Sequence, residues 1–107
     1  MRYTVFFLQE AEHDLEGILE YIVESGSPAA AGDLIKRIRT ACESLSQMPE
    51  RGSVPPELGG IGSQAYRQLI VHPYRIICQV VESSVFIFAV IHGHRNIEEV
   101  LKQRLLR

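Results

Sequence analysis

Three apolar runs in the second half of the chain constrain the fold more than any other feature. They are QAYRQLIVH (64–72), YRIICQVV (74–81) and VFIFAVIH (85–92), and each is rich in β-branched and aromatic residues. Runs of this length and composition are typical of β-strands. Pro73 separates the first two runs, and ESS (82–84) separates the last two. Because connections this short join antiparallel neighbours, the pattern predicts a three-stranded antiparallel meander.

The first half of the chain predicts one strand and two helices. YTVFFL (3–8) is β-branched and aromatic and too short for a helix, so we expect a strand there. Over residues 9–25 the apolar side chains recur every three or four positions, which predicts an amphipathic helix. Gly26 is placed to end this helix, and Pro28 is placed in the first turn of a second one. The short link predicts that the two helices form an antiparallel hairpin.

The end of the chain predicts a third helix, which Asn96 is suited to cap, with Glu99 at the capping-box position. Residues 49–63 contain three prolines and four glycines, which favours a loop before the meander. The expected order is β-α-α-β-β-β-α. We therefore expect an α+β fold in a single domain spanning residues 1–107. In it, the N-terminal strand and the helical hairpin pack on a small antiparallel sheet, which the first strand joins, and a short C-terminal helix follows.

Charge is unevenly distributed between the two halves of the chain. Residues 1–50 contain four lysines and arginines against nine acids (4 − 9 = −5), and residues 51–107 contain seven against four (7 − 4 = +3), which gives the net charge of −2. The second half is therefore expected to build a cationic face. The slightly acidic total disfavours sequence-independent binding to nucleic acid. We expect no direct sequence-specific binding either.

The sequence also predicts the compartment. The N-terminus has only a short apolar stretch before its first acids, which is not a signal peptide, and no stretch approaches the ~18 apolar residues of a membrane span. Cys42 and Cys78 have no short spacing and lie in apolar runs, so we expect two reduced core thiols rather than a disulfide. We therefore expect a soluble cytoplasmic protein without membrane association and without a cofactor.

The last predicted strand leads directly into a polar cluster, His92, His94 and Arg95, around Gly93. Such a cluster is a reactive site, an edge that docks an acidic partner, or an ordinary solvated turn before a capped helix. A metal site is not predicted, because zinc requires three or four protein ligands and the other histidines lie on other elements without ligand spacing.

Two arginines of the meander are expected near this cluster. Arg67 shares a strand face with the apolar Val71, and Arg75 stands near the start of the next strand. In a meander the far end of a neighbouring strand lies beside these positions, so Arg67, Arg75, His94 and Arg95 are expected on one sheet edge or in one shallow groove. Converging guanidinium groups bind carboxylates or phosphates in a bidentate manner. The alternative is that these arginines are solvated surface residues.

Five segments of the chain follow one another in a recognisable order. They are TVFFLQEAEHDLEGILEYI, SPAAAGDLIKRI, SLSQMPERG, YRQLIVHPYRIICQVVE and VFIFAVIHGHRN. In order and spacing they resemble the RelE/ParE toxin superfamily over nearly the whole chain. The resemblance implies a helical hairpin on a small antiparallel sheet. It also implies the toxin of a type II toxin–antitoxin pair, a class associated with plasmid stabilisation, which forms a hetero-oligomer with an antitoxin whose C-terminal part wraps it.

This superfamily contains toxins with two mechanisms. RelE-like toxins cleave mRNA in the ribosomal A site, whereas ParE-like toxins inhibit DNA gyrase and stop replication. Ribonuclease chemistry needs a base, an acid and cations that neutralise the phosphorane. If the chain is a ribonuclease, the resemblance implies cations at Arg67, Arg75 and Arg95 and proton transfer by His92 or His94.

The ParE-like branch is the better match. The catalytic tyrosine of several RelE-type enzymes would fall near Leu101, and the segment PERGSVPPELGG lacks the lysines that such enzymes use. The resemblance thus favours a gyrase inhibitor that is not an enzyme and has no catalytic residues. A degenerate toxin kept as an antitoxin-binding scaffold is a third alternative. In the ParE-like interpretation, the residues expected to meet acidic groups of the antitoxin or target are Arg67, Tyr74, Arg75, His92, His94 and Arg95.

Overall fold

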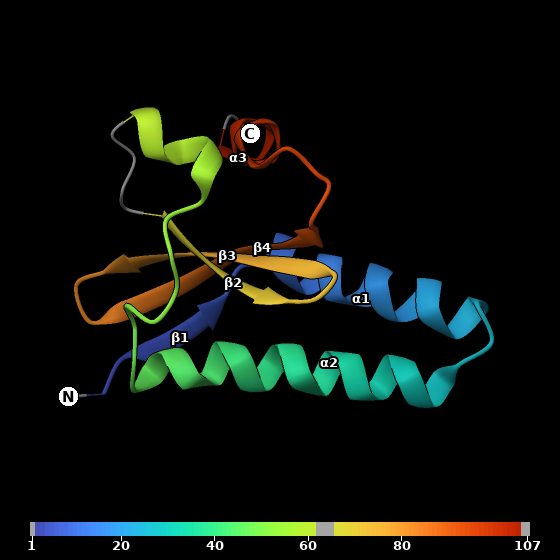
Figure 1. Ribbon diagram of the computed structural model, residues 1–107. Coiled ribbons are helices and arrows are strands. Elements are labelled where there is room, and N and C mark those ends of the chain that lie inside the picture. Colours follow the sequence, from blue (N-terminus) through green and yellow to red (C-terminus); the bar gives the residue numbers. More distant parts are fainter. Residues whose placement is uncertain (1, 62–65, 106–107) are drawn as a thin grey trace.

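The computed structural model describes residues 2–61 and 66–105 and contains the predicted order of strands and α-helices (Figure 1). It adds two short 3₁₀ helices, one of which lies inside the predicted loop 49–63. The first two residues of the predicted strand 64–72 lie outside the described residues. The elements are β1 (Thr4–Phe7), α1 (Gln9–Glu24), α2 (Pro28–Glu43), η1 (Ser44–Ser46), η2 (Pro56–Ile61), β2 (Tyr66–Val71), β3 (Tyr74–Val81), β4 (Ser84–His92) and α3 (Ile97–Leu105).

The four strands form one sheet in the order β1-β4-β3-β2. β2, β3 and β4 pair antiparallel in sequence, so the predicted meander is confirmed. β1 also joins the sheet, as expected, and it does so parallel to β4, from Thr4↔Ser84 to Phe7↔Ile87. Parallel neighbours require a long crossover connection, and the helical hairpin and the meander between β1 and β4 supply it. The sheet is therefore mixed rather than purely antiparallel.

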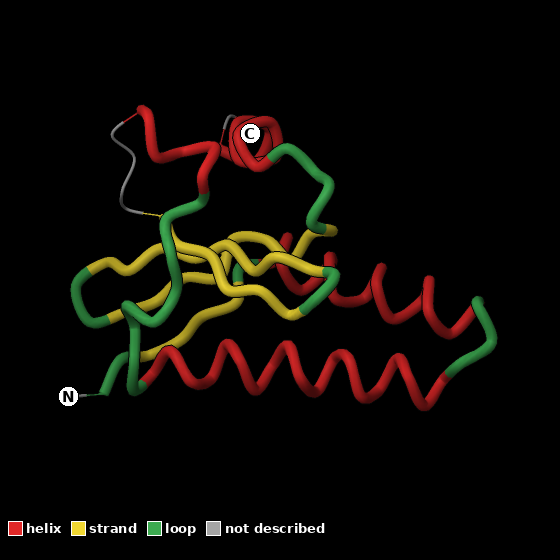
Figure 2. Tube along the Cα trace, viewed as in Figure 1, coloured by secondary structure: helices red, strands yellow, loops and turns green. Residues whose placement is uncertain are grey.

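Helices lie on both faces of this sheet (Figure 2). The α1–α2 hairpin covers one face, where Ile38, Ile76 and Ile87 are fully buried in the larger core cluster. α3 and η2 lie over the other face and enclose a smaller cluster that contains Ile77 and Ile97. Burying apolar surface is the main term that holds such layers together, at about 25 cal/mol for each Å² removed from water.

The helix boundaries follow the predicted signals. α1 ends at Glu24, and Gly26 adopts a left-handed φ of 93°, a conformation that glycine reaches without a steric cost. Pro28 is the first residue of α2. At α3 the amide of Glu99 donates to Oδ1 of Asn96 at 3.2 Å, so the predicted cap is confirmed.

Both cysteines are free and fully buried, as the sequence predicts. Burial raises the pKa of Cys42 to about 12 and that of Cys78 to about 11. In the described part of the chain, no helix combines the length and the apolar character needed to cross a membrane.

Candidate functional site

The site lies where β3 begins and β4 ends. Tyr74 and His92 are paired residues of these strands, and their rings meet edge to face with centroids 5.7 Å apart. His94 stacks on His92 with centroids 4.4 Å apart. The turn between the histidines is tight, because the amide of Gly93 donates to the carbonyl of Pro73 at 2.8 Å. A Cβ at position 93 would lie 3.3 Å from that oxygen, which favours glycine there.

Four of the five N–H donors of Arg75 form hydrogen bonds within the protein. Its Nη1 and Nη2 atoms contact Oε2 and Oε1 of Glu57 at 2.7 and 2.8 Å, and Nε and Nη2 donate to Oε1 of Gln68 at 2.9 and 2.7 Å. Only 11% of the Arg75 side chain is exposed. The hydrogen bond from Arg75 is the largest cause that lowers the pKa of Glu57, and it favours the charged carboxylate.

Glu57 is a site residue that the sequence analysis missed. It belongs to η2, inside the segment predicted as a loop, and no periodic pattern marks it. Its own backbone and, more weakly, the backbone of Ile97 at the start of α3 lower this pKa further. Glu57 therefore ties the segment predicted as a loop to strand β3.

Arg67 does not join Arg75, so the predicted convergence of these two arginines is wrong. Arg67 is paired with Cys78, which packs in the core cluster beneath the helical hairpin, whereas Arg75 is paired with Ile70, whose side chain is 59% exposed. The two arginines therefore lie on opposite faces of the sheet. Arg67 instead donates to the carbonyl oxygens of Gly52 and Glu50 at 2.7 and 3.3 Å and fixes the loop before β2.

The other predicted residues do gather, around two open hollows on either side of Tyr74 and His92. One hollow, of about 580 Å³, is lined by residues that include Tyr74, Arg75, His92 and His94. The other, of about 570 Å³, is lined by residues that include Tyr21, Tyr74, His92 and Arg95. Arg95 and His94 are exposed, and Arg95 has no ion pair among the residues that the structure describes.

A second ion pair borders this site and was also missed. Asp14 of α1 contacts Nη1 and Nη2 of Arg104 of α3 at 2.8 and 2.7 Å and accepts the amide of Val90 at 2.8 Å. Arg104 also donates to the carbonyl of Phe88 at 2.9 Å. These backbone groups of β4 lie beyond the last residue that pairs with β1, so the ion pair satisfies them at an edge where no described strand pairs with β4. Ninety positions separate the two residues, so no local pattern indicates the contact.

No group of three or more histidine, cysteine, aspartate or glutamate side chains within the described ranges is arranged to hold a metal ion. The site therefore offers cations, imidazoles and aromatic rings. That chemistry suits the binding of acidic groups.

The sequence matches the protein family described as ParE toxin of type II toxin-antitoxin system, parDE, over residues 5–97. This match spans most of the chain. The chain belongs to the ParE toxin family. As a member of this family within the RelE/ParE superfamily, it is the toxin of a type II toxin–antitoxin system, and a cognate antitoxin is implied as its partner.

Known proteins of both branches are similar to this ParE-family chain. Toxin RelE2 of Caulobacter vibrioides is 35% identical over 83 residues, which cover 77% of this chain and 85% of that protein. A structure of the chromosomal ParDE system of P. aeruginosa superposes with a TM-score of 0.70 at 18% identity, covering 85% of this chain and 96% of that one. A mutant of E. coli toxin RelE in the free state superposes with a TM-score of 0.66 at 17% identity, covering 100% and 98%. The expected RelE/ParE fold is thereby confirmed.

Proposed function

We propose that this toxin acts as ParE-like toxins do, by binding DNA gyrase and stopping replication without chemistry of its own. In this proposal, the surface formed by His92, His94 and Arg95, which lies over the largely buried Tyr74, contacts the target. The cognate antitoxin neutralises the toxin by covering that surface and forming a hetero-oligomer with it. Because gyrase is a cytoplasmic enzyme, the toxin acts in the cytoplasm.

The observation that supports the proposal most strongly is that the guanidinium of Arg75 is bound by Glu57 and Gln68. A ribonuclease of the RelE type would need this guanidinium to neutralise the phosphorane, but here Glu57 and Gln68 occupy four of its five N–H donors. Arg67, a second expected cation, faces the opposite side of the sheet. Leu101, near which the catalytic tyrosine of several RelE-type enzymes would fall, is 5% exposed and packs in the cluster under α3. These three placements support binding rather than RNA cleavage.

The test is pulse-labelling of a bacterial host minutes after the toxin is induced without its antitoxin. Thymidine incorporation should fall first while methionine incorporation continues, and the purified toxin should inhibit supercoiling by gyrase in vitro. If methionine incorporation falls first, the protein is a ribosome-dependent ribonuclease, and His92, His94 and Arg95 become the candidates for catalysis. If neither changes, the chain is an antitoxin-binding scaffold without toxicity.

A further inference from the structure

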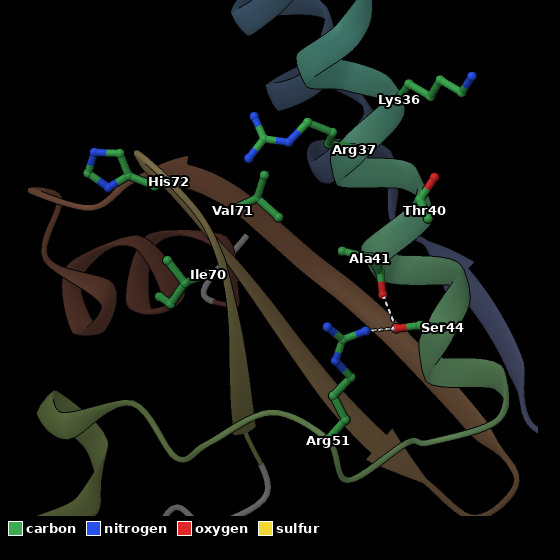
Figure 3. Close-up of a pocket in the computed structure, with 9 residues that line it drawn as sticks. All are labelled: Lys36, Arg37, Thr40, Ala41, Ser44, Arg51, Ile70, Val71 and His72. Carbon is green, nitrogen blue, oxygen red and sulfur yellow. Dashed lines mark hydrogen bonds between the residues drawn. The ribbon is translucent and has the colours of Figure 1, made fainter.

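A separate groove runs between helix α2 and strand β2, with a volume of about 470 Å³ (Figure 3). Ala41 and Val71 supply its apolar lining, and Thr40 and Ser44 add hydroxyl groups. Among the described residues, none of those that line it is acidic. The groove meets one of the hollows of the site at Ile70 and His72, which line both, but the site residues Tyr74, His92 and Arg95 do not line it.

The cations of this groove carry positive charge that no ion pair between described residues neutralises. Within residues 2–61 and 66–105, Lys36, Arg37 and Arg51 form no ion pair, whereas Arg39 on the same helix pairs with Glu12. Figure 3 shows the guanidinium groups of Arg37 and Arg51 in the space between α2 and β2. The guanidinium of Arg51 donates to Oγ of Ser44, a neutral acceptor that leaves its charge intact.

The strand that borders the groove has an open edge. β2 is the last strand in the sheet, and the bridge that the described residues form at its outer edge is at Gln68, whose amide and carbonyl bond to Ser53 at 2.7 and 3.1 Å. The hydrogen-bonding groups of an antiparallel strand alternate in direction, so those of Ile70 point to the same outer edge as those of Gln68. In the described part of the chain, no strand pairs with Ile70 at that edge. The Ile70 side chain is 59% exposed.

We propose that this groove binds an extended acidic segment of a partner protein, which adds to β2 as a fifth strand at Ile70. The carboxylates of that segment pair with Arg37 and Arg51, and an apolar side chain contacts Ile70. Strand addition supplies backbone hydrogen bonds, and the flanking side chains supply selectivity. The assignment of this segment to the antitoxin rests on the proposed function. The binding chemistry of the groove is argued from its own residues and does not depend on that function.

An acidic peptide suits this groove better than a nucleic acid does. Both would neutralise the cations, but an unpaired amide and carbonyl on a strand edge are matched by another peptide backbone. The net charge of −2 also works against a polyanion, whose affinity depends on many phosphate contacts.

The experiment is an NMR titration of the intact toxin with capped hexapeptides. The first peptide alternates valine and glutamate, the second alternates valine and lysine, and the third is the acidic peptide with N-methyl groups on alternate amides. The acidic peptide should shift the amide of Ile70 and slow its hydrogen exchange, and the other two should not. The double variant Arg37→Glu/Arg51→Glu should weaken binding about tenfold or more. Lys102→Glu, an exposed control on α3, should leave it unchanged.

The proposal fails if the acidic peptide produces no shift at Ile70, or if the lysine peptide binds equally well. If the N-methylated peptide binds equally well, backbone hydrogen bonds do not contribute to binding. The peptide would then be held by charge alone and would not form a fifth strand. An oligothymidylate that shifts the same residues at lower concentration than the acidic peptide would make the groove a nucleic-acid site. These readouts do not depend on toxicity. If the peptide binds as expected while DNA synthesis is unaffected, the peptide-binding proposal is supported and the proposed function is contradicted.

Discussion

Arg75 of β3 and Glu57 of η2 form a bidentate ion pair across 18 positions of sequence, with both N–O distances below 3 Å. Removing one partner of such a pair leaves a charge that is poorly solvated. We predict that Glu57→Gln lowers the free energy of unfolding by about 2 kcal/mol, as measured by urea denaturation. Glu98→Gln, at an exposed position in the first turn of α3, is the matched control and should change it by less than about 0.5 kcal/mol. Equal effects of the two variants would show that the pair adds no stability.

The same pair predicts a dependence of stability on pH. Arg75 holds the pKa of Glu57 below its ordinary value of 4.5, so the unfolded chain binds the proton more readily than the folded one. The stabilisation is therefore complete above the unfolded pKa and is lost as the pH falls through the folded pKa. Urea midpoints measured from about pH 6 to pH 3 should fall more steeply for the wild type than for Glu57→Gln. Parallel curves would contradict this assignment.

The ion pair between Asp14 and Arg104 should hold α3 against the rest of the fold. Both side chains are largely buried, at 14% and 13% exposure. We predict a coupling free energy of about 2 kcal/mol in a double-mutant cycle with Asp14→Asn and Arg104→Met. Amides of α3 should also exchange faster in either variant, as measured by hydrogen exchange.

A matched cycle on Glu12 and Arg39 provides the control for that coupling. This pair also joins separate helices, but its side chains are 43% and 44% exposed. We expect a coupling of less than about 1 kcal/mol, because solvent screens exposed charges. If both cycles give the same value, burial does not strengthen the Asp14–Arg104 contact.

Arg95 is the arginine whose removal tests the binding surface most directly. It is exposed and has no ion pair in the described ranges, so Arg95→Ala should leave the melting temperature within about 2 °C of wild type. We predict that it weakens growth arrest or antitoxin affinity about tenfold. Arg75→Ala does not allow this separation of binding from stability, because it also removes the partner of Glu57. Unchanged growth arrest and unchanged antitoxin affinity for Arg95→Ala would remove Arg95 from the site, and Lys102→Ala is the control.

The two cysteines should be unreactive in the folded protein. Burial raises the pKa of both thiols, to about 12 and about 11, so the thiolate is scarce at neutral pH. We expect negligible modification of Cys42 and Cys78 by iodoacetamide in buffer and complete modification in denaturant, as measured by mass spectrometry. Rapid labelling of the native protein would show that the core opens readily around these residues.

The sequence by itself determined the order of the elements and most of their boundaries. Apolar periodicity records which side of each element is buried, and it identified the hairpin α1–α2 and the meander β2–β4. Gly26 and Asn96 marked helix ends because their preferences are local. The same local reasoning placed Arg75, His94 and Arg95 near one end of the sheet, since short turns bring adjacent strand ends together.

Only the tertiary structure decided which faces the arginines occupy and which of them are neutralised. Arg67 and Arg75 were expected together, but the strand register pairs them with Cys78 and Ile70 on opposite faces. Register depends on the geometry of the turn, and a shift of one residue exchanges the two faces of a strand. Glu57 and Asp14 find their partners 18 and 90 positions away. Such contacts form only when the fold brings distant segments of the chain together, and local sequence patterns do not indicate which segments meet.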